Sequence, residues 1–226
     1  MAGPPLFPAL IGELIRTTKF SCWLFFKLGF GLEVTGQAGV PKRGPFIVAS
    51  NHVSFLDPPL IGVACPRRLR FMARADLYHQ PLLAAFLRGV RTISIKRGEA
   101  DLTAIRAGLA CLRAGEPVAI FPEGGRQLSG ALGSAKRGVG FLAEAAGVPV
   151  IPAYVSGTFQ ALPPHAHGLC RAKIRVAFGE PIAYTSVPVS TTAGPDAGVR
   201  GSRARQESLA DAVTRQWKHL AAYRPE

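Results

Sequence analysis

The sequence predicts an α/β fold: a mostly parallel central sheet with helices on both faces, preceded by an N-terminal amphipathic helical segment. Short apolar runs suited to buried strands alternate with helical patterns from residue 33 onward, and this alternation is typical of parallel sheets. Apolar residues make up 48% of the 226-residue chain, which is enough for a sizeable core.

Each predicted element rests on a local pattern. Strands are predicted where short apolar or alternating runs occur, at 46–49, 92–95, 118–121, 148–155 and 174–178. Helices are predicted where apolar residues repeat at helical spacing, at 59–64, 81–88, 102–112 and 136–146. Two prolines within 148–155 predict that this strand lies near an edge of the sheet, because proline cannot donate a backbone hydrogen bond.

Three segments are predicted along the chain. They are an N-terminal amphipathic helical anchor, a central α/β domain, and a linker with a C-terminal amphipathic helix that packs on that domain, at 1–32, 33–185 and 186–226. The C-terminal helix has a clear apolar face made by Leu209, Val213, Trp217 and Leu220.

The N-terminal segment is the most apolar long stretch, but charged residues interrupt it. Its longest uncharged run, Phe20 to Phe26, has seven residues, well short of the roughly 20 that a membrane-spanning helix needs. Its apolar residues share a helical face, and aromatic side chains gather toward residue 30, as they do at membrane interfaces. The segment predicts a helix or helical hairpin lying in a membrane surface, and an ordinary core helix is the alternative.

The balance of charge is strongly basic: 27 Lys and Arg against 14 Asp and Glu give a formal net charge of +13. Such an excess predicts an anionic partner, such as a phosphate-bearing substrate, an anionic membrane surface or nucleic acid. The basic residues are spread along the chain and form no recognisable recognition helix, which argues against nucleic acid. The four cysteines are widely spaced without a C-x-x-C pair, so free thiols and no zinc site are predicted.

The stretch Asn51–Pro59 is the first candidate for chemistry. On a continuous helix His52 and Asp57 would point about 140° apart. Pro58, however, disfavours helical angles at Asp57 and favours a strand, a tight turn and a helix start. In such a turn Asp57 can fold back toward His52, fix its tautomer and make it a general base suited to near-neutral pH. The alternatives are that Asp57 caps the following helix and that His52 is a hydrogen-bonded histidine at a strand end.

A second loop of the same kind, residues 122–126, follows the strand at 118–121 and reads Pro-Glu-Gly-Gly-Arg. Ligands bind at the carboxyl ends of strands in parallel α/β sheets, and both loops occupy such positions. Consecutive glycines let backbone amides approach an anion closely. Glu123 has the alternative role of a helix-capping acid.

Four blocks in fixed order make the sequence resemble the glycerolipid acyltransferases, the family of 1-acylglycerol-3-phosphate acyltransferases. The first block is Asn-His-x4-Asp at 51–57, and the second is a strand that ends in an arginine, Arg97. The third, Phe-Pro-Glu-Gly-Thr-Arg in the family, is seen here as Phe-Pro-Glu-Gly-Gly-Arg at 121–126, and the fourth is a Val-Pro-hydrophobic-hydrophobic-Pro strand, at 148–152. The resemblance covers about residues 33–185, and the combination is far more specific than any single block.

The resemblance implies that the central domain is an acyltransferase catalytic domain. Such a domain moves a fatty acyl group from acyl-CoA or acyl-ACP, the co-substrate, to the free hydroxyl of a lysophospholipid. The implied acceptor is 1-acylglycerol-3-phosphate, which gives phosphatidic acid. Transfer is expected to be direct, with no cofactor and no metal, which agrees with the lack of a G-x-S-x-G motif.

The same resemblance implies roles for single residues. His52 would take the proton of the attacking hydroxyl, while Asp57 would orient His52 and stabilise the imidazolium. Arg97 would hold the acceptor's phosphate, with Lys96 or Arg91 as substitutes. The acceptor's head group and glycerol would be positioned by four loop residues: Glu123, Gly124, Gly125 and Arg126.

Three departures from the family pattern affect the acceptor. Gly125 stands where the family usually has Thr, Gln127 where Ser is common, and Lys96 where an acidic residue often precedes the arginine. Loss of a hydroxyl changes the hydrogen bonds offered to the acceptor. This weakens the assignment of 1-acylglycerol-3-phosphate and strengthens the alternative of another lysolipid, such as a lyso-ornithine lipid or lysophosphatidylcholine.

The predicted partners are a lysophospholipid acceptor, an acyl thioester donor that includes acyl carrier protein as a candidate, and an anionic membrane surface. The expected location is monotopic, on the cytoplasmic face of a membrane. Three alternatives remain: a non-catalytic lipid-binding relative, a nucleic-acid-binding protein and a metal-dependent hydrolase that uses His52 and Asp57.

Overall fold

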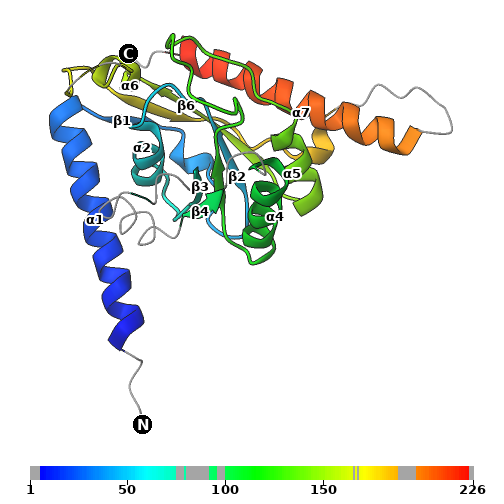
Figure 1. Cartoon of the computed structure of the whole chain (residues 1–226), viewed down its shortest axis with the longest axis horizontal. Helices are drawn as coiled ribbons and strands as arrows, with labels where there is room; N and C mark the ends of the chain where they lie inside the picture. The colour runs from blue at the N-terminus through cyan, green and yellow to red at the C-terminus, as the bar shows by residue number, and fades with distance from the viewer. Residues whose placement is uncertain are drawn as a thin grey trace.

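The protein is described from a computed structural model that covers residues 6–74, 79, 92–95, 100–164, 166, 168–187 and 197–223. These residues contain a seven-stranded sheet with the order β1-β7-β6-β2-β5-β3-β4 (Figure 1). The strands are β1 Glu33–Thr35, β2 Ile47–Ser50, β3 Arg70–Arg74, β4 Ile93–Ile95, β5 Val118–Ile120, β6 Val150–Ser156 and β7 Arg175–Phe178. Neighbouring strands are parallel except for β6 and β7, so the predicted mostly parallel α/β sheet is confirmed.

Helices cover both faces of the sheet (Figure 1). They are α1 Leu6–Phe30, α2 Asp57–Ala64, α4 Ala100–Arg113, α5 Gly138–Ala146, α6 Thr158–Ala161 and α7 Ala197–Ala222, with 3-10 turns η1 Gln37–Gly39 and η3 Tyr184–Ser186. Strand β2 shows the two-sided burial directly. Val48 packs with α1 and α2 in one core cluster, while Ile47 and Ala49 pack with α4, α5 and α7 in the other. Alternating side chains thus enter opposite cores, as a central strand requires.

Helix α1 is one continuous helix of 25 residues rather than a hairpin. Phe26 and Phe30 are buried against the domain, and the Lys19 ammonium donates to the Cys65 carbonyl at 2.6 Å. Several large apolar side chains of α1 stay exposed: Phe20, Trp23, Leu24, Phe25 and Leu28. Within the described residues, no helix combines the length and the apolar character that crossing a bilayer requires.

Strand β6 corrects the prediction that the proline-containing strand lies near an edge, because it runs between β7 and β2. Pro152 pairs with Ala49 of β2, while the ladder with β7 begins only at the next pair, Ala153 with Phe178. The Pro152 carbonyl accepts from the Gly179 N–H at 2.8 Å, so this residue faces β7 just beyond the end of that ladder. An interior strand therefore tolerates the missing N–H at this position.

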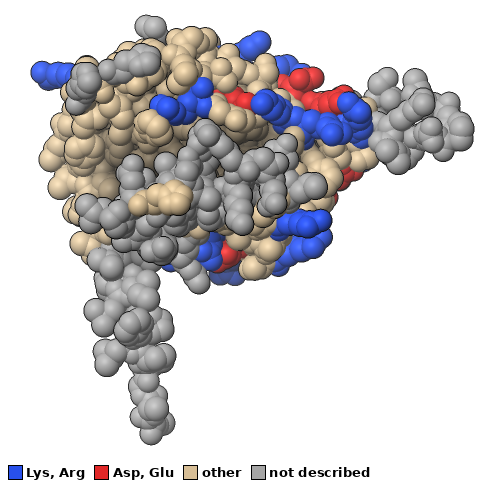
Figure 2. Space-filling model, in the orientation of Figure 1, with Lys and Arg blue, Asp and Glu red and all other residues tan. Residues whose placement is uncertain are grey.

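Helix α7 packs its apolar face on the sheet and on α5. Leu209, Val213 and Trp217 are buried, and the Trp217 indole N–H donates to the Ala49 carbonyl of β2 at 3.0 Å. Lys and Arg side chains on the face seen in Figure 2 form several separate groups, which agrees with their even spread along the sequence. The helix predicted at 81–88 lies outside the described residues.

Candidate active site

The turn after β2 places Asp57 against His52. The Asp57 side chain is fully buried, and its Oδ2 accepts from His52 Nδ1 at 2.9 Å and from the backbone N–H groups of Val53 and Ser54, each at 2.7 Å. Since a carboxylate only accepts, Nδ1 carries the ring proton and Nε2 is left as the basic nitrogen. Asp57 is the first residue of α2, but its carboxylate bonds the turn that precedes the helix, so it does not act as a helix cap.

The second Asp57 oxygen has a partner that the sequence did not indicate. Oδ1 accepts from the Thr158 hydroxyl at 2.6 Å. Thr158 is fully buried in α6, directly after β6, and lies 101 residues from Asp57 in the chain. No local pattern links the two residues, because only the adjacency of β2 and β6 in the sheet brings them together.

The loop after β5 supports the imidazole, so the two strand-end loops of the sequence analysis do meet. The His52 ring stacks on the Phe121 ring with centroids 4.2 Å apart and planes inclined by 26°. The His52 carbonyl accepts from the Gln127 N–H at 2.8 Å. The His52 side chain is 16% exposed, which leaves it accessible at the carboxyl edge of the sheet.

Asn51 fixes the chain immediately before His52. Its amide nitrogen donates to the Val155 carbonyl at 3.0 Å, and its amide oxygen accepts from the Val155 N–H at 2.7 Å. This side chain extends the β2–β6 pairing past the end of β2. The turn therefore leaves the sheet from a fixed point.

Glu123 is a buried carboxyl group in the second loop, only 4% exposed. Neither of its oxygens makes a hydrogen bond of regular geometry. Burial raises the pKa of Glu123, and the nearby Gln127 amide and the backbone N–H groups of His52 and Gly133 offset only part of that rise. Both oxygens thus keep capacity for a donor from a bound molecule.

Basic groups lie on and against the loop that holds Glu123. The Arg126 guanidinium carbon sits 3.6 Å from the centroid of the Phe55 ring, a cation–π contact between the two loops. Gly124 has a φ of +79°, and a Cβ there would come within 2.6 Å of the Lys136 ammonium nitrogen. A glycine is therefore required at 124, with Lys136 lying against it. A Cβ at Gly125, in contrast, would meet nothing within 4 Å.

The structure thus brings most of the predicted site residues to one place at the carboxyl edge of the sheet. His52 and Asp57 are hydrogen-bonded, and the loop that holds Glu123 and Arg126 contacts them. Arg97 lies outside the described residues. Among the described residues, no group of three or more His, Cys, Asp and Glu side chains is arranged to hold a metal ion.

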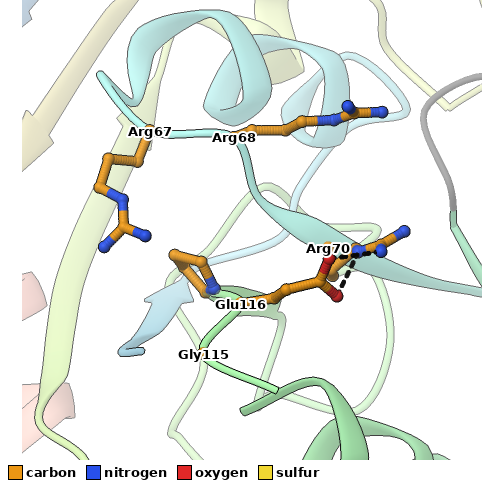
Figure 3. A pocket seen from close by; sticks show the side chains of 6 residues that line it. Arg67, Arg68, Arg70, Gly115 and Glu116 are labelled. Atoms are coloured by element: carbon orange, nitrogen blue, oxygen red, sulfur yellow. Dashed lines mark hydrogen bonds and ion pairs between the residues drawn. The ribbon is translucent and has the colours of Figure 1, made fainter. Parts of the chain in front are cut away.

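A separate cavity of about 300 Å³ lies at the other end of the strands, where β3 and β5 begin (Figure 3). It is lined by Arg67, Arg68, Arg70, Gly115, Glu116 and Pro117. Arg70 pairs with both oxygens of Glu116, at 2.8 and 2.6 Å, and Arg67 donates to the Gly44 carbonyl. Arg67 and Arg68 precede β3 and Arg70 begins it, so these side chains lie at the amino ends of the strands and do not contribute to the site around His52.

The fold and the site define an α/β enzyme with a carboxylate-oriented histidine at a strand end. The acyltransferase family model matches residues 31–156, more than half of the chain. The chain belongs to this family, among the glycerolipid acyltransferases that its four blocks predicted.

The names of three similar proteins specify two different acceptors, 1-acyl-sn-glycerol-3-phosphate and a lyso-ornithine lipid. The 1-acyl-sn-glycerol-3-phosphate acyltransferase of Bacillus subtilis is 26% identical over 153 residues, which are 67% of this chain and 74% of the relative. The human alpha enzyme of the same name is 35% identical over 133 residues, 57% of this chain and 46% of the relative. The lyso-ornithine lipid O-acyltransferase of Pseudomonas aeruginosa is 37% identical over 98 residues, 43% of this chain and 36% of the relative. The chain therefore spans less than half the length of the human and Pseudomonas relatives.

A solved structure shows the same fold. The 1-acyl-sn-glycerophosphate (LPA) acyltransferase PlsC from Thermotoga maritima superposes with a TM-score of 0.71 at 24% sequence identity, covering 96% of this chain and 81% of that one.

Proposed function

We propose that the protein transfers a fatty acyl group from a thioester, acyl-CoA or acyl-ACP, to the hydroxyl of 1-acylglycerol-3-phosphate, giving phosphatidic acid. The observation that carries the proposal is the 2.9 Å contact between His52 Nδ1 and a fully buried Asp57 carboxylate. That contact leaves Nε2 free as a base at the edge of the sheet where α/β proteins bind ligands.

The reaction follows from this geometry. His52 Nε2 takes the proton of the acceptor hydroxyl as the hydroxyl oxygen attacks the carbonyl carbon of the thioester. The π electrons of that carbonyl group move onto the carbonyl oxygen. When this intermediate collapses, the carbon–sulfur bond breaks, and the leaving thiolate takes the proton from the imidazolium. An ester and a free thiol result. The negative charge of Asp57 stabilises the imidazolium between the two proton transfers.

The second loop supplies the features that an acceptor with a phosphate requires. Arg126, held on the Phe55 ring, offers a planar guanidinium to phosphate oxygens, and the Lys136 ammonium lies beside Gly124. The buried oxygens of Glu123 can accept a hydrogen bond from a hydroxyl of the acceptor. Arg97 is assigned to the same phosphate through the family resemblance.

A lyso-ornithine lipid is the second candidate acceptor, favoured by one observation. Gly125 opens onto space where the family usually places a threonine, so the loop has room for a bulkier head group. A relative named for that acceptor is 37% identical over 98 residues.

Helix α1 supports a proposed position on the cytoplasmic face of a membrane. Its exposed apolar side chains include the aromatic residues typical of an interface: Phe20, Trp23 and Phe25. The net charge of +13 would draw the protein toward an anionic surface. Monotopic binding keeps the site close to its lipid substrates.

The test uses purified full-length protein, a labelled acyl-CoA or acyl-ACP, and a panel of lysolipid acceptors. Wild type is expected to form phosphatidic acid from 1-acylglycerol-3-phosphate, and His52→Ala to lose on the order of 10³-fold in rate. His219→Ala is the matched control, since His219 lies exposed on α7. Equal rates in His52→Ala and wild type would exclude His52 as the base. Binding of lysolipid without turnover in wild type would indicate a lipid-binding relative.

A further inference from the structure

We infer that Thr158 is a positioning residue of the acyl-transfer site: its hydroxyl holds the Asp57 carboxylate in the orientation that supports His52. The inference deepens the proposed function and rests on it. Thr158 has no exposed surface, so it acts through Asp57 and does not touch the substrates.

Different donors bind the two oxygens of Asp57. Oδ2 accepts from His52 Nδ1 and from two backbone N–H groups, while Oδ1 accepts from the Thr158 hydroxyl at 2.6 Å. The three bonds at Oδ2 fix that atom in place, but the carboxylate plane can still pivot about it. The bond at Oδ1 is the one that sets the plane, and hence the direction in which Oδ2 faces Nδ1.

Thr158 also supplies a hydrogen-bond donor that the buried Asp57 carboxylate needs. A carboxylate that is fully buried loses its hydration, and an oxygen left without a donor there is costly. Replacing the hydroxyl by a methyl group would leave Oδ1 facing an apolar group. The carboxylate would then turn toward other donors and weaken its hold on His52.

The fold delivers Thr158 to this position by a glycine turn. Gly157 has a φ of +86°, and a Cβ on it would lie 1.9 Å from the Lys173 carbonyl oxygen, so only glycine fits. The turn ends β6 and makes Thr158 the first residue of α6. The Thr158 carbonyl accepts from the Leu162 N–H at 2.9 Å, which fixes its backbone.

Two further contacts tie the same segment to the catalytic turn. The Asn51 amide bonds both backbone groups of Val155, and the Ser54 hydroxyl donates to the Leu162 carbonyl at 3.4 Å. Residues 155–162 therefore form a rigid support behind the turn that holds His52. The sequence predicted only a strand at 148–155, and the structure assigns a role in the site to Thr158, two residues beyond the end of β6.

The experiment compares Thr158→Val, which keeps the shape but loses the hydroxyl, with Thr158→Ser, which keeps the hydroxyl. Thr158→Val is expected to lower kcat by on the order of 10–100-fold, with KM for both substrates within about 2-fold of wild type. Thr158→Ser is expected to retain kcat within about 3-fold. If the valine variant does not fold, Thr158→Ala serves as the variant without a hydroxyl.

Thr214→Val is the matched control for a lost buried hydroxyl. Thr214 lies in α7, where its hydroxyl donates to the Ala210 carbonyl and accepts from the Ala135 N–H. That variant is expected to lose thermal stability but keep kcat. Wild-type kcat in Thr158→Val, an equal loss in Thr158→Ser, or a change confined to KM would each overturn the inference.

A spectroscopic readout separates this inference from the proposed reaction. The Nδ1 proton of His52, bonded to a carboxylate, should give a downfield NMR signal in wild type and in Thr158→Ser. The signal should shift or broaden in Thr158→Val. If no acceptor is acylated by wild type, the proposed reaction fails, yet this signal still reports whether Thr158 positions Asp57. An unchanged signal in Thr158→Val would refute the positioning role.

Discussion

Two buried carboxyl groups in adjoining loops differ in the hydrogen bonds that they receive from the protein. Asp57, in the loop after β2, receives hydrogen bonds from His52, Val53, Ser54 and Thr158. Glu123, in the loop after β5, is almost as deeply buried but has no regular hydrogen bond to either oxygen. The first loop is complete within the protein itself, whereas the second has unused hydrogen-bonding capacity.

The difference indicates a division of labour. Under the proposed function His52 is a general base, and a general base works best when its support is fixed before the reaction begins, which the bonds to Asp57 achieve. An acceptor site must exchange bonds with a molecule that comes and goes, so an unbonded buried group is retained there despite its cost to stability. Each of the following variants alters one side of this comparison, and Glu123→Gln has the largest expected effect.

Glu123→Gln would break the comparison most strongly by replacing the buried carboxyl group with an uncharged amide. We expect kcat/KM to fall by about 10–100-fold, since hydrogen bonds to charged groups contribute about 1.5–3 kcal/mol. We also expect Tm to rise by about 2–4 °C, the change that roughly 1 kcal/mol gives in a chain of this size. Steady-state kinetics and a thermal melt measure the two effects.

The gain in stability should depend on pH. Because burial raises the pKa of Glu123, the folded protein holds this proton more tightly than the unfolded chain does. The stability that protonated Glu123 contributes is present below the pKa of Glu123 in the unfolded chain. It is lost as pH rises through the higher pKa of Glu123 in the folded protein. The Tm advantage of Glu123→Gln should therefore be larger near about pH 8 than near about pH 5.

Glu144→Gln is the control and should lower Tm, because Tyr184, Ser202 and Gln206 all donate to Glu144. A lower Tm in Glu123→Gln would contradict the prediction.

Phe55→Ala would remove the ring on which Arg126 rests and so loosen the contact between the two loops. A partly exposed cation–π contact contributes about 0.5–1 kcal/mol, so we expect KM for a phosphate-bearing acceptor to rise by about 2–5-fold with kcat unchanged. Phe55→Tyr keeps the ring and should behave as wild type. A loss in kcat alone would show that the ring serves His52 rather than Arg126.

Gly125→Thr would sharpen the comparison by giving the second loop the hydroxyl that the family usually has. The open space at Gly125 should accept the side chain, so Tm should hold. One hydrogen bond to the acceptor contributes about 0.5–1.5 kcal/mol, which predicts a shift of about 2–10-fold in relative kcat/KM toward 1-acylglycerol-3-phosphate over a lyso-ornithine lipid. Gly124→Thr, with its left-handed backbone and the adjacent Lys136, should destabilise the loop instead. An unchanged ratio of kcat/KM between the two acceptors in Gly125→Thr would show that Gly125, in place of the family's threonine, does not affect the choice of acceptor.

Local patterns in the sequence predicted five of the seven strands in the described residues, all but β1 and β3, and the meeting of His52 with Asp57. These two residues are five positions apart, and the prolines that follow define the turn between them. The partnership of Thr158 with Asp57 was missed, because it depends on which strands are neighbours, and strand order is not written in any one segment. The same gap explains the wrong position given to β6. Its prolines indicated an edge, but the ladder with β7 simply ends before Pro152.

The hydrogen bond from Gln127 to the His52 carbonyl has a consequence for timing. It ties the turn that holds His52 to the loop that the proposed function assigns to the acceptor, so the two keep a fixed position relative to each other. Water competes as a nucleophile for any thioester, but it is too small to span the distance between a base and a cationic anchor. Under the proposed function, this arrangement favours a bound acceptor over water as the nucleophile and so spares the thioester donor from hydrolysis.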